Sequence, residues 1–371
     1  MTEPEPLQQV NRTYVRYRGR TLSYFGGCDY FRLASHPVVL AAVRDGLRRF
    51  GLNVAASRLT SGDHRVYGKL EKQLATFFRA EAALLVSNGY VTSLAAAQAL
   101  TGQHSHALID ERAHVALQDA TPFLDCPVLK FKHRDPDDFE RAVRRCGRGS
   151  RLVVLTDGMF GHDGSVAPLQ AYLKRLPRDG LLLVDDAHGA GTLGQTGGGA
   201  VEFEGVSRAR VVQCVTLSKA FGVYGGAVIC GRRLRDQIVA HSRLFAGSTP
   251  LPLPLAHAAN AALCVVKSDR TLRSRLSRNA DHVKDGLRGA GLALSEAPGP
   301  ILPICFKRPQ TCQRLQQALL RAEIWPPFIK YPGGPATGYF RFAISSEHTQ
   351  RQLDDLVNVL TPFMPHALTQ V

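Results

Sequence analysis

Residues 181–191 read LLLVDDAHGAG and residues 215–222 read VTLSKAFG, and these two stretches decide the fold. The first begins with an apolar run typical of a buried parallel strand, and Asp185, Asp186 and His188 follow at its carboxyl end. The second is another apolar strand, followed by Lys219 in a turn that glycine flanks. Open α/β sheets bind their ligands at the carboxyl ends of strands. The two stretches therefore predict an acid and an amine at one ligand-binding edge.

This pair of residues suits a site for pyridoxal phosphate (PLP). In such a site Lys219 forms the Schiff base, and Asp185 pairs with the protonated pyridine nitrogen so that the ring accepts electrons. His188 follows Asp185 by three residues and is placed to reach the phenolic oxygen of the cofactor. Thr216 is placed to offer a hydroxyl to the phosphate, although strand propensity alone also explains a threonine there.

A second turn upstream is a candidate phosphate site. Residues 86–90, VSNGY, end a strand and open a helix predicted at 91–100. Because a helix N-terminus offers N–H groups and a positive dipole end, we expect Asn88, Gly89 and Tyr90 to bind the cofactor phosphate. His114 follows the strand predicted at 107–109, and it is either a surface histidine or an imidazole stacked on the pyridine ring.

The order of apolar runs indicates the fold class. Strand-like runs alternate with helical stretches at 82–86, 107–109, 152–155, 181–184, 211–215 and 226–230. This alternation predicts an α/β fold with a mostly parallel sheet and helices on both faces. Residues 14–18 and 21–25 predict a hairpin, 36–50 a helix, and 256–286 one long helical pattern after the proline-rich residues 250–254. We expect an N-terminal arm (1–27), a large PLP-binding domain (28–264) and a small C-terminal α+β domain (265–371).

Composition narrows the classes of protein. The 371 residues are 44% apolar and 21% charged, which is typical of a globular protein. No run approaches the roughly 18 apolar residues of a membrane span, and we expect a cytoplasmic protein. The eight cysteines have no metal-ligand spacing, so we expect reduced thiols and no metal. The net charge of +15 fits nucleic acid, a membrane surface or a polyanionic substrate such as a coenzyme A thioester, but no basic tract is interleaved with aromatics. We therefore expect no nucleic-acid partner.

Six motifs in order carry a family resemblance. They are Ser57-Arg-Leu-Thr-Ser-Gly62, Ser87-Asn-Gly-Tyr90, Thr156-Asp-Gly-Met-Phe160 with Asp163-Gly164, Val184-Asp-Asp-Ala-His-Gly189, Thr216-Leu-Ser-Lys-Ala-Phe-Gly222 and Ser248-Thr249-Pro250. From about Tyr24 to Leu360 the chain resembles the α-oxoamine synthases of PLP fold-type I. That group includes 8-amino-7-oxononanoate synthase, 2-amino-3-ketobutyrate CoA ligase, 5-aminolevulinate synthase and serine palmitoyltransferase.

The resemblance implies a role for each matching residue. Lys219 becomes the Schiff-base lysine, Asp185 the pyridinium partner, His188 the contact to the phenolic oxygen, and His114 the stacking residue. Ser248 and Thr249 match a loop that reaches the phosphate of the neighbouring subunit, which implies a homodimer with shared active sites. Arg341 matches the arginine that holds the amino-acid carboxylate, a task that suits its forked guanidinium. The alternative for Arg341 is an exposed strand residue.

The chain departs from the family pattern at several positions. Cys28 stands where the family has an asparagine that helps to position the substrate carboxylate. Asp157, which we count among the cofactor-binding residues, replaces a glutamate, Gly161 replaces a serine, and Tyr67 replaces a histidine. Lys330 stands where the family often has an arginine near the substrate entrance, and it either meets an acyl-chain carboxylate or thioester phosphates or is simply solvated.

The implied reaction is a decarboxylative Claisen condensation. An amino acid, best matched by L-alanine, and an acyl-CoA thioester give an α-amino ketone, as in the 8-amino-7-oxononanoate synthases of biotin biosynthesis. The alternatives are a glycine- or serine-using synthase, a synthase that takes its thioester from a carrier protein, and an aminotransferase. A regulatory protein that keeps the PLP fold and binds nucleic acid is a further alternative, against which the lack of an added DNA-binding module counts.

Overall fold

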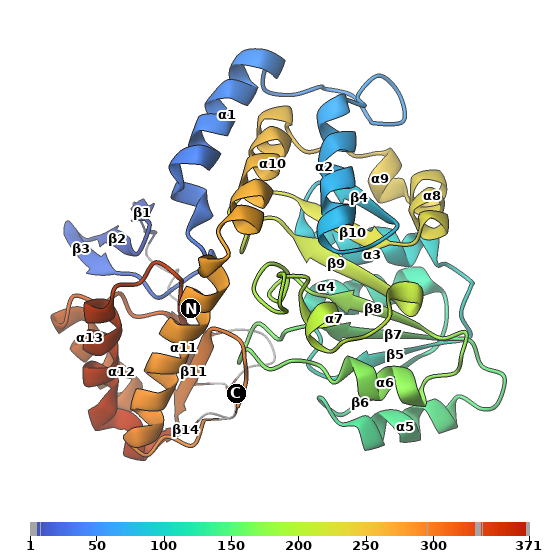
Figure 1. Ribbon diagram of the computed structural model, residues 1–371. Helices are drawn as coiled ribbons and strands as arrows, with labels where there is room; N and C mark the ends of the chain where they lie inside the picture. Colours follow the sequence, from blue (N-terminus) through green and yellow to red (C-terminus); the bar gives the residue numbers. More distant parts are fainter. Residues whose placement is uncertain (1–5, 8, 295, 331–334, 336, 369–371) are drawn as a thin grey trace. The chain divides into compact units, whose positions relative to one another are not determined.

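The computed structural model describes residues 6–7, 9–294, 296–330, 335 and 337–368 (Figure 1). The chain divides into two compact units. The sheet unit comprises His36–Phe160 and Val166–Asp269, and the terminal unit comprises Met1–Ser35, Gly161–Ser165 and Arg270–Val371. This grouping by contacts differs from the segments predicted at 1–27, 28–264 and 265–371, because N-terminal residues pack with the C-terminal part of the chain.

A seven-stranded sheet organises the sheet unit. Its order is β4 (Ala82–Val86), β10 (Gly226–Cys230), β9 (Val211–Thr216), β8 (Leu181–Asp185), β7 (Leu152–Asp157), β5 (His106–Asp110) and β6 (Val128–Phe131). Strands β5 to β9 pair in parallel, whereas β10 runs antiparallel to both β4 and β9. The predicted mostly parallel α/β sheet is therefore confirmed. β6 was not predicted, and its side chains at Val128 and Lys130 are exposed, so it lacks a continuous apolar run.

Helices cover both faces of this sheet. One buried cluster joins the sheet to α3 (Gly89–Ala99), α4 (Val115–Ala120), α8 (Arg232–His241) and α9 (Arg243–Ala246). The other joins it to α5 (Pro136–Arg145), α6 (Leu169–Arg175) and α7 (Ala200–Phe203). On β5, Ala107 and Ile109 belong to the first cluster and Leu108 to the second. Successive side chains of a strand thus enter opposite cores, which is why the strands read as continuous apolar runs.

Three further helices complete the sheet unit. They are α1 (Pro37–Phe50), α2 (Arg65–Phe77) and α10 (Leu253–Ser268), and α10 packs against both of the others. The pattern predicted as one helix over 256–286 is in fact α10 and α11 (Thr271–Gly289). Asp269 has a ψ of 86°, outside the helical range, and ends α10. The boundary between the two units falls at this break.

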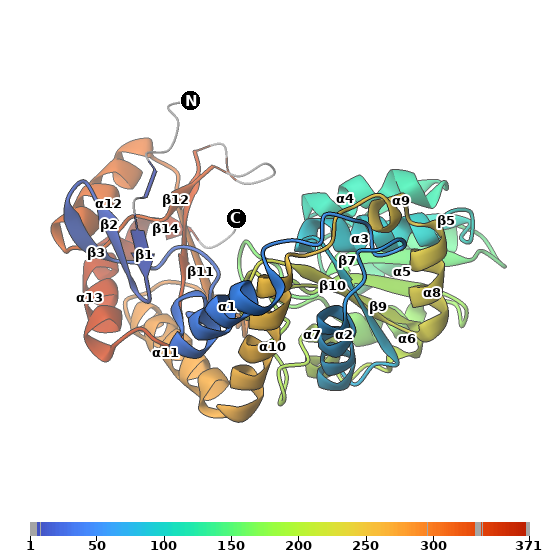
Figure 2. The same ribbon diagram turned by 90° about the horizontal axis from the view of Figure 1, so that it is seen from above.

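The terminal unit contains both ends of the chain. Its N-terminal part is an antiparallel sheet of β1 (Gln9–Asn11), β2 (Tyr14–Tyr17) and β3 (Arg20–Ser23). Its C-terminal part is a four-stranded antiparallel sheet in the order β12 (Phe328–Ile329), β13 (Tyr339–Ala343), β11 (Ile301–Phe306), β14 (Ala367–Leu368), with α11, α12 (Pro309–Arg321) and α13 (Gln350–Leu360) (Figure 2). The Ala343 N–H donates to the Phe25 carbonyl, and the Phe25 ring lies in the core of this unit. Among the described residues, no helix has the length and apolar character needed to cross a membrane.

Candidate active site

The carboxyl ends of β7 and β8 bring two buried acids side by side. Asp157 ends β7, Asp185 ends β8, and the two residues are register partners in the parallel ladder. Their exposed fractions are 6% and 7%. The backbone carbonyl of Asp185 accepts the Gly158 N–H at 2.7 Å, and its Oδ1 accepts the Ala187 N–H at 3.1 Å. The sheet therefore fixes both carboxyl groups at the edge that sequence analysis predicted for a ligand.

Lys219 lies in the connection between β9 and β10. The Leu217 N–H donates to the Gly225 carbonyl at 2.9 Å, and the Gly222 N–H donates to the Lys219 carbonyl at 2.9 Å. These bonds close a compact turn beyond the last residue of β9, with the Lys219 side chain half-buried. The turn keeps the amine at the same end of the sheet as the two acids.

His114 joins this group from the N-terminus of α4. Its N–H donates to Asp157 Oδ1 at 3.1 Å, and its Nδ1 lies 3.8 Å from Asp185 Oδ2. The same nitrogen accepts the Ala116 N–H at 3.3 Å, so the imidazole caps the helix. The Tyr90 ring meets the His114 ring edge-on, with 6.3 Å between centroids. His114 therefore contacts both acids through different atoms, which fixes the position of its ring.

Burial is the largest cause of the pKa shifts of Asp157 and His114. It raises the pKa of Asp157 well above its ordinary range, and the charge of Asp185 raises this pKa further. The His114 N–H and the charge of Lys219 act in the opposite direction. Burial lowers the pKa of His114, an effect that Asp185 opposes and Lys219 reinforces. Two adjacent carboxylates in a buried site repel each other, so we infer a protonated Asp157 beside a neutral imidazole.

The N-terminus of α3 approaches β9 closely. Asn88 caps the helix by accepting the Val91 N–H at 3.2 Å, and its amide donates to the Tyr224 hydroxyl at 3.2 Å. A Cβ atom on Gly89 would lie 2.6 Å from Cβ of Thr216, so only glycine fits at this distance. The Thr216 hydroxyl donates to the Gly225 carbonyl at 3.2 Å. The first N–H groups of α3 thus open beside the strand that leads to Lys219.

The contacts of Tyr224 and Asp119 and the complete burial of Asp186 were not predicted from the sequence. Tyr224 bonds Asn88, and Asp119 bonds the Tyr90 hydroxyl. Asp186 is fully buried directly after Asp185. No local sequence signal marks Tyr224 or Asp119, because their partners come from other elements, whereas two successive acids after an apolar strand are a signal for a buried carboxyl group.

The remaining sequence-predicted residues of the sheet unit lie in the segments that follow β8 and α9. His188 is half-buried in the turn after β8, and the Thr192 hydroxyl donates to its carbonyl at 2.8 Å. Ser248 is half-buried and Thr249 is exposed, and both follow α9. The Ser57 hydroxyl donates to the Ala246 carbonyl at 2.6 Å, so the 57–62 motif is bonded to the last residue of α9.

In the terminal unit, Arg341 meets two of the positions that depart from the family pattern. Arg341 is half-buried on β13, and its N–H donates to the Pro327 carbonyl at 3.0 Å. Its Nη1 donates to the Gly161 carbonyl at 3.2 Å, and its Nη2 lies 3.9 Å from the Cys28 Sγ. Lys330 is exposed beyond β12. The Gly161 backbone carbonyl and the Cys28 thiol are therefore two of the groups that the guanidinium meets.

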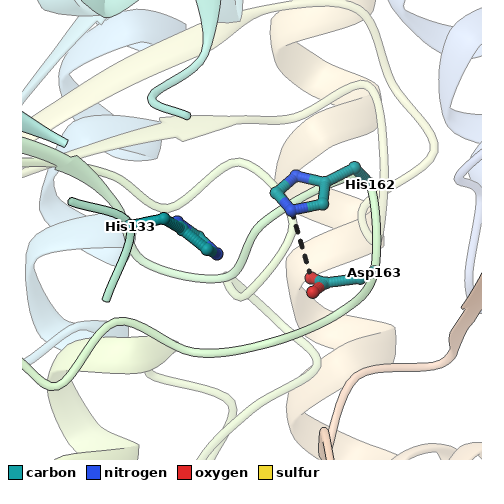
Figure 3. A group of neighbouring side chains, drawn as sticks. All are labelled: His133, His162 and Asp163. Carbon is teal, nitrogen blue, oxygen red and sulfur yellow. Dashed lines mark ion pairs between the residues drawn. The ribbon is translucent and has the colours of Figure 1, made fainter. Parts of the chain in front are cut away.

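The Asp163 carboxylate stabilises the short segment that contains Gly161. His162 Nε2 lies 3.6 Å from Asp163 Oδ1 (Figure 3), and that oxygen accepts both the N–H and the hydroxyl of Ser165. The Gly299 N–H donates to the Gly164 carbonyl at 3.1 Å. Residues 161–165 thus form a compact turn fixed to the loop before β11.

The acid, the amine and the helix N-terminus of the sheet unit match the functional groups of PLP. A buried carboxylate at Asp185 suits a pyridinium nitrogen, and a half-buried amine at Lys219 suits an aldehyde. The glycine at the start of α3, where a Cβ would clash with Thr216, leaves the helix N-terminus open to a phosphate. The residues present therefore fit this cofactor.

Comparisons with known proteins agree with this chemistry. A profile of the family described as aminotransferase class I and II matches residues 26–360. The 8-amino-7-oxononanoate synthase of Thioalkalivibrio sulfidiphilus is 35% identical over 345 residues, covering 92% of this chain and 88% of that protein. The enzyme of the same name from Methylococcus capsulatus is 34% identical over 367 residues, covering 97% and 93%. A serine palmitoyltransferase of S. paucimobilis with bound PLP shares the fold, with a TM-score of 0.90, 24% identity and coverage of 97% and 92%. This chain belongs to the aminotransferase class I and II family and, within it, to the PLP-dependent α-oxoamine synthases.

Proposed function

We propose that this enzyme condenses L-alanine with an acyl-CoA thioester, releasing carbon dioxide and coenzyme A and giving an α-amino ketone. The observation that carries the proposal is the group formed by Asp157, Asp185 and His114 beside the Lys219 turn, which fits the cofactor of this family. Identities of 34–35% to 8-amino-7-oxononanoate synthases support that reaction and a role in biotin biosynthesis.

Each proposed site residue has one task. The bound cofactor supplies an electron-withdrawing ring that stabilises negative charge at the substrate Cα. Asp185 keeps the ring nitrogen protonated, His114 covers the ring face, and His188 donates to the phenolic oxygen. The phosphate is assigned to the first N–H groups of α3 at Asn88, Gly89 and Tyr90, to Thr216, and to Ser248 and Thr249 from a second subunit.

Lys219 and Arg341 act on the substrate. We assign to the Lys219 amine the removal of the Cα proton and its later return, because a half-buried amine in the turn after β9 would be a positioned base. Arg341 binds the amino-acid carboxylate, and Lys330 meets the acyl substrate. Burial and the neighbouring Asp185 raise the pKa of Asp157, so we assign Asp157 as a neutral carboxyl group beside Asp185, the proposed partner of the ring nitrogen.

The surroundings of Arg341 favour a second candidate for the amino-acid substrate. Arg341 contacts Cys28 and Gly161, and both positions depart from the family pattern. A thiol is a weak hydrogen-bond donor compared with an amide, so the carboxylate is held differently from the family pattern. Glycine or serine is therefore the second candidate donor, and a carrier-protein thioester the second candidate acceptor.

A homodimer is part of the proposal. Leu40 and Leu47 on α1 and Leu52 and Leu59 after it are exposed large apolar side chains, each at least 40% exposed. Such residues gathered on one helix and the loop that follows it are typical of a protein interface. We place the cytoplasm as the site of action, as in the family.

The first experiment tests Lys219. Absorbance of the protein with PLP is compared for the wild type, Lys219→Ala and, as a control on an exposed helical lysine, Lys69→Ala. The proposal predicts that borohydride fixes the cofactor to the wild type and to Lys69→Ala, and that Lys219→Ala keeps its fold but is not labelled. Labelling of Lys219→Ala at another lysine would refute the assignment.

A second experiment identifies the substrates. Alanine, glycine and serine are each supplied with acyl-CoA thioesters of several chain lengths, and free thiol and carbon dioxide are measured. We expect equal amounts of both products with alanine. Conversion of PLP to pyridoxamine phosphate without thiol release identifies an aminotransferase instead.

A further inference from the structure

Asp186 is a buried acid with no task in the proposed reaction. Its side chain is 0% exposed. Its Oδ2 accepts the Gln213 amide at 2.6 Å and the Ala200 N–H at 2.8 Å. Its Oδ1 has no hydrogen-bond partner in the part of the chain that the structure describes. A buried carboxyl group with one unpartnered oxygen is costly, so its position calls for a physical reason.

The chain closes around this carboxyl group with glycines. A Cβ on Gly199 would lie 1.9 Å from Oδ2 of Asp186, and a Cβ on Gly189 would lie 2.1 Å from Oδ1. A Cβ on Gly158 would lie 2.4 Å from Oδ1. All three are closer than any real Cβ contact, so the backbone itself packs against the acid. Gly158 follows Asp157 and Gly189 follows His188, so Asp186 touches the segments that carry both residues.

Asp186 also closes the base of a loop. The Asp186 carbonyl accepts the Ala190 N–H at 2.9 Å, while its side chain holds the Ala200 N–H at the start of α7. His188 lies in the loop that these bonds close, and Asp185 directly precedes Asp186. Gln213 extends the contact by donating to the Gly198 carbonyl and accepting from Arg208. The network therefore ties the turn after β8 to β9 and to α7.

We propose that Asp186 is a positioning residue that holds Asp185 and His188 in the geometry required to bind the PLP ring. The inference rests on the proposed function, because it needs these two residues to contact the cofactor. Asp186 itself does not touch the ring: it acts through its neighbours.

The pKa of Asp186 agrees with a positioning role. Burial raises the pKa of Asp186 to about 7, and the charge of Asp185 acts in the same direction. The bonds from Gln213 and Ala200 and the charge of Arg208 oppose the rise. A group that is partly neutral near pH 7 does its work through hydrogen-bond acceptance, which an amide oxygen reproduces.

The test compares two substitutions of Asp186 with a control on the same loop. Asp186→Ala removes both acceptor oxygens, and Asp186→Asn keeps one. Glu202→Gln is the control, because Glu202 holds the Thr196 and Gly198 N–H groups from α7 without contacting Asp185. Each apo protein is titrated with PLP. The readouts are the dissociation constant, the visible circular dichroism of the bound ring, and the urea midpoint of the apo protein.

We expect Asp186→Ala, which removes both acceptor oxygens, to weaken PLP binding about tenfold, or about 1.4 kcal/mol, and to reduce the visible dichroism. Asp186→Asn should restore binding to within about threefold and recover the dichroism. Glu202→Gln should lower only the urea midpoint. If Asp186→Ala binds PLP with wild-type affinity and dichroism, or if Glu202→Gln reproduces its defect, the inference is overturned.

A second variant covers a failure to fold. If Asp186→Ala is unfolded, Gln213→Leu removes one of the two partners of Oδ2 and leaves the acid in place, and a loss of dichroism in the same direction is expected. Unchanged PLP binding in that variant overturns the inference. Lys219→Ala is measured in parallel: if it leaves the cofactor spectrum unchanged, the proposed function itself fails, whatever Asp186 does.

Discussion

Replacing Gly89 with alanine tests the proposed phosphate site at the start of α3. The new Cβ would lie 2.6 Å from Cβ and 2.8 Å from Oγ1 of Thr216. Carbon atoms in ordinary contact are about 3.5–4.0 Å apart, so α3 must move away from β9 by roughly 1 Å. Overpacking of this kind costs about 1–3 kcal/mol. Because the displaced N–H groups are those assigned to the phosphate, we expect PLP to bind about 5- to 150-fold more weakly.

The assay is a PLP titration of the apo protein, paired with urea unfolding. The matched control is Gly68→Ala on α2, where an added Cβ meets nothing within 4 Å. Removing a glycine from the interior of a helix stabilises it by about 0.5–1 kcal/mol, so this control should keep its PLP affinity and gain stability. Wild-type PLP affinity in Gly89→Ala would show that the start of α3 does not bind the phosphate.

Two further predictions concern stability. Arg58 and Glu71 form an ion pair with side chains only 8% and 10% exposed, so Arg58→Met should leave a buried carboxylate and lower the free energy of unfolding by about 3–5 kcal/mol in urea titrations. A loss below about 1 kcal/mol would contradict this reasoning. Burial lowers the pKa of His348 to about 3, so the imidazole is neutral when folded and takes up a proton on unfolding below pH 6.5. Its stabilising contribution is present above pH 6.5 and is lost as the pH falls towards 3. Between pH 7 and pH 5 this loss is about 2 kcal/mol, so urea unfolding of His348→Gln should depend on pH less steeply by that amount, and parallel profiles would contradict it.

The sheet was predictable because its strands are buried on both faces. β4 and β10 match the predicted runs 82–86 and 226–230, and β8 ends one residue beyond its prediction. Continuous apolar runs bounded by polar residues give a strong signal. β6 at the sheet edge has exposed side chains and lacks that signal. The break between α10 and α11 was missed because the apolar spacing continues across Asp269 and neither glycine nor proline marks the residue where the backbone leaves the helical range.

The candidate site was predictable in part. The strand ends at Asp185 and Lys219 follow from local pattern, because residues after parallel strands meet at one edge. The contact of His114 with Asp157 and Asp185 depends on the strand order, which local pattern does not fix. The contact of Arg341 with Cys28 and Gly161 joins residues more than 170 positions apart, and no spacing rule predicts it.

The terminal unit is assembled from both ends of the chain, and this determines when each part can fold. The chain crosses between the units at residues 35–36, 160–161, 165–166 and 269–270. Phe25 packs in a core otherwise built from residues after 279, and Ser23 bridges to Ile324. During synthesis the N-terminal strands emerge first, yet their partners emerge last, whereas the sheet unit is complete at Asp269. Cleavage of a single connection between the units would therefore release neither of them, and a chain stopped near residue 290 would carry a finished sheet unit and an N-terminal segment without its core.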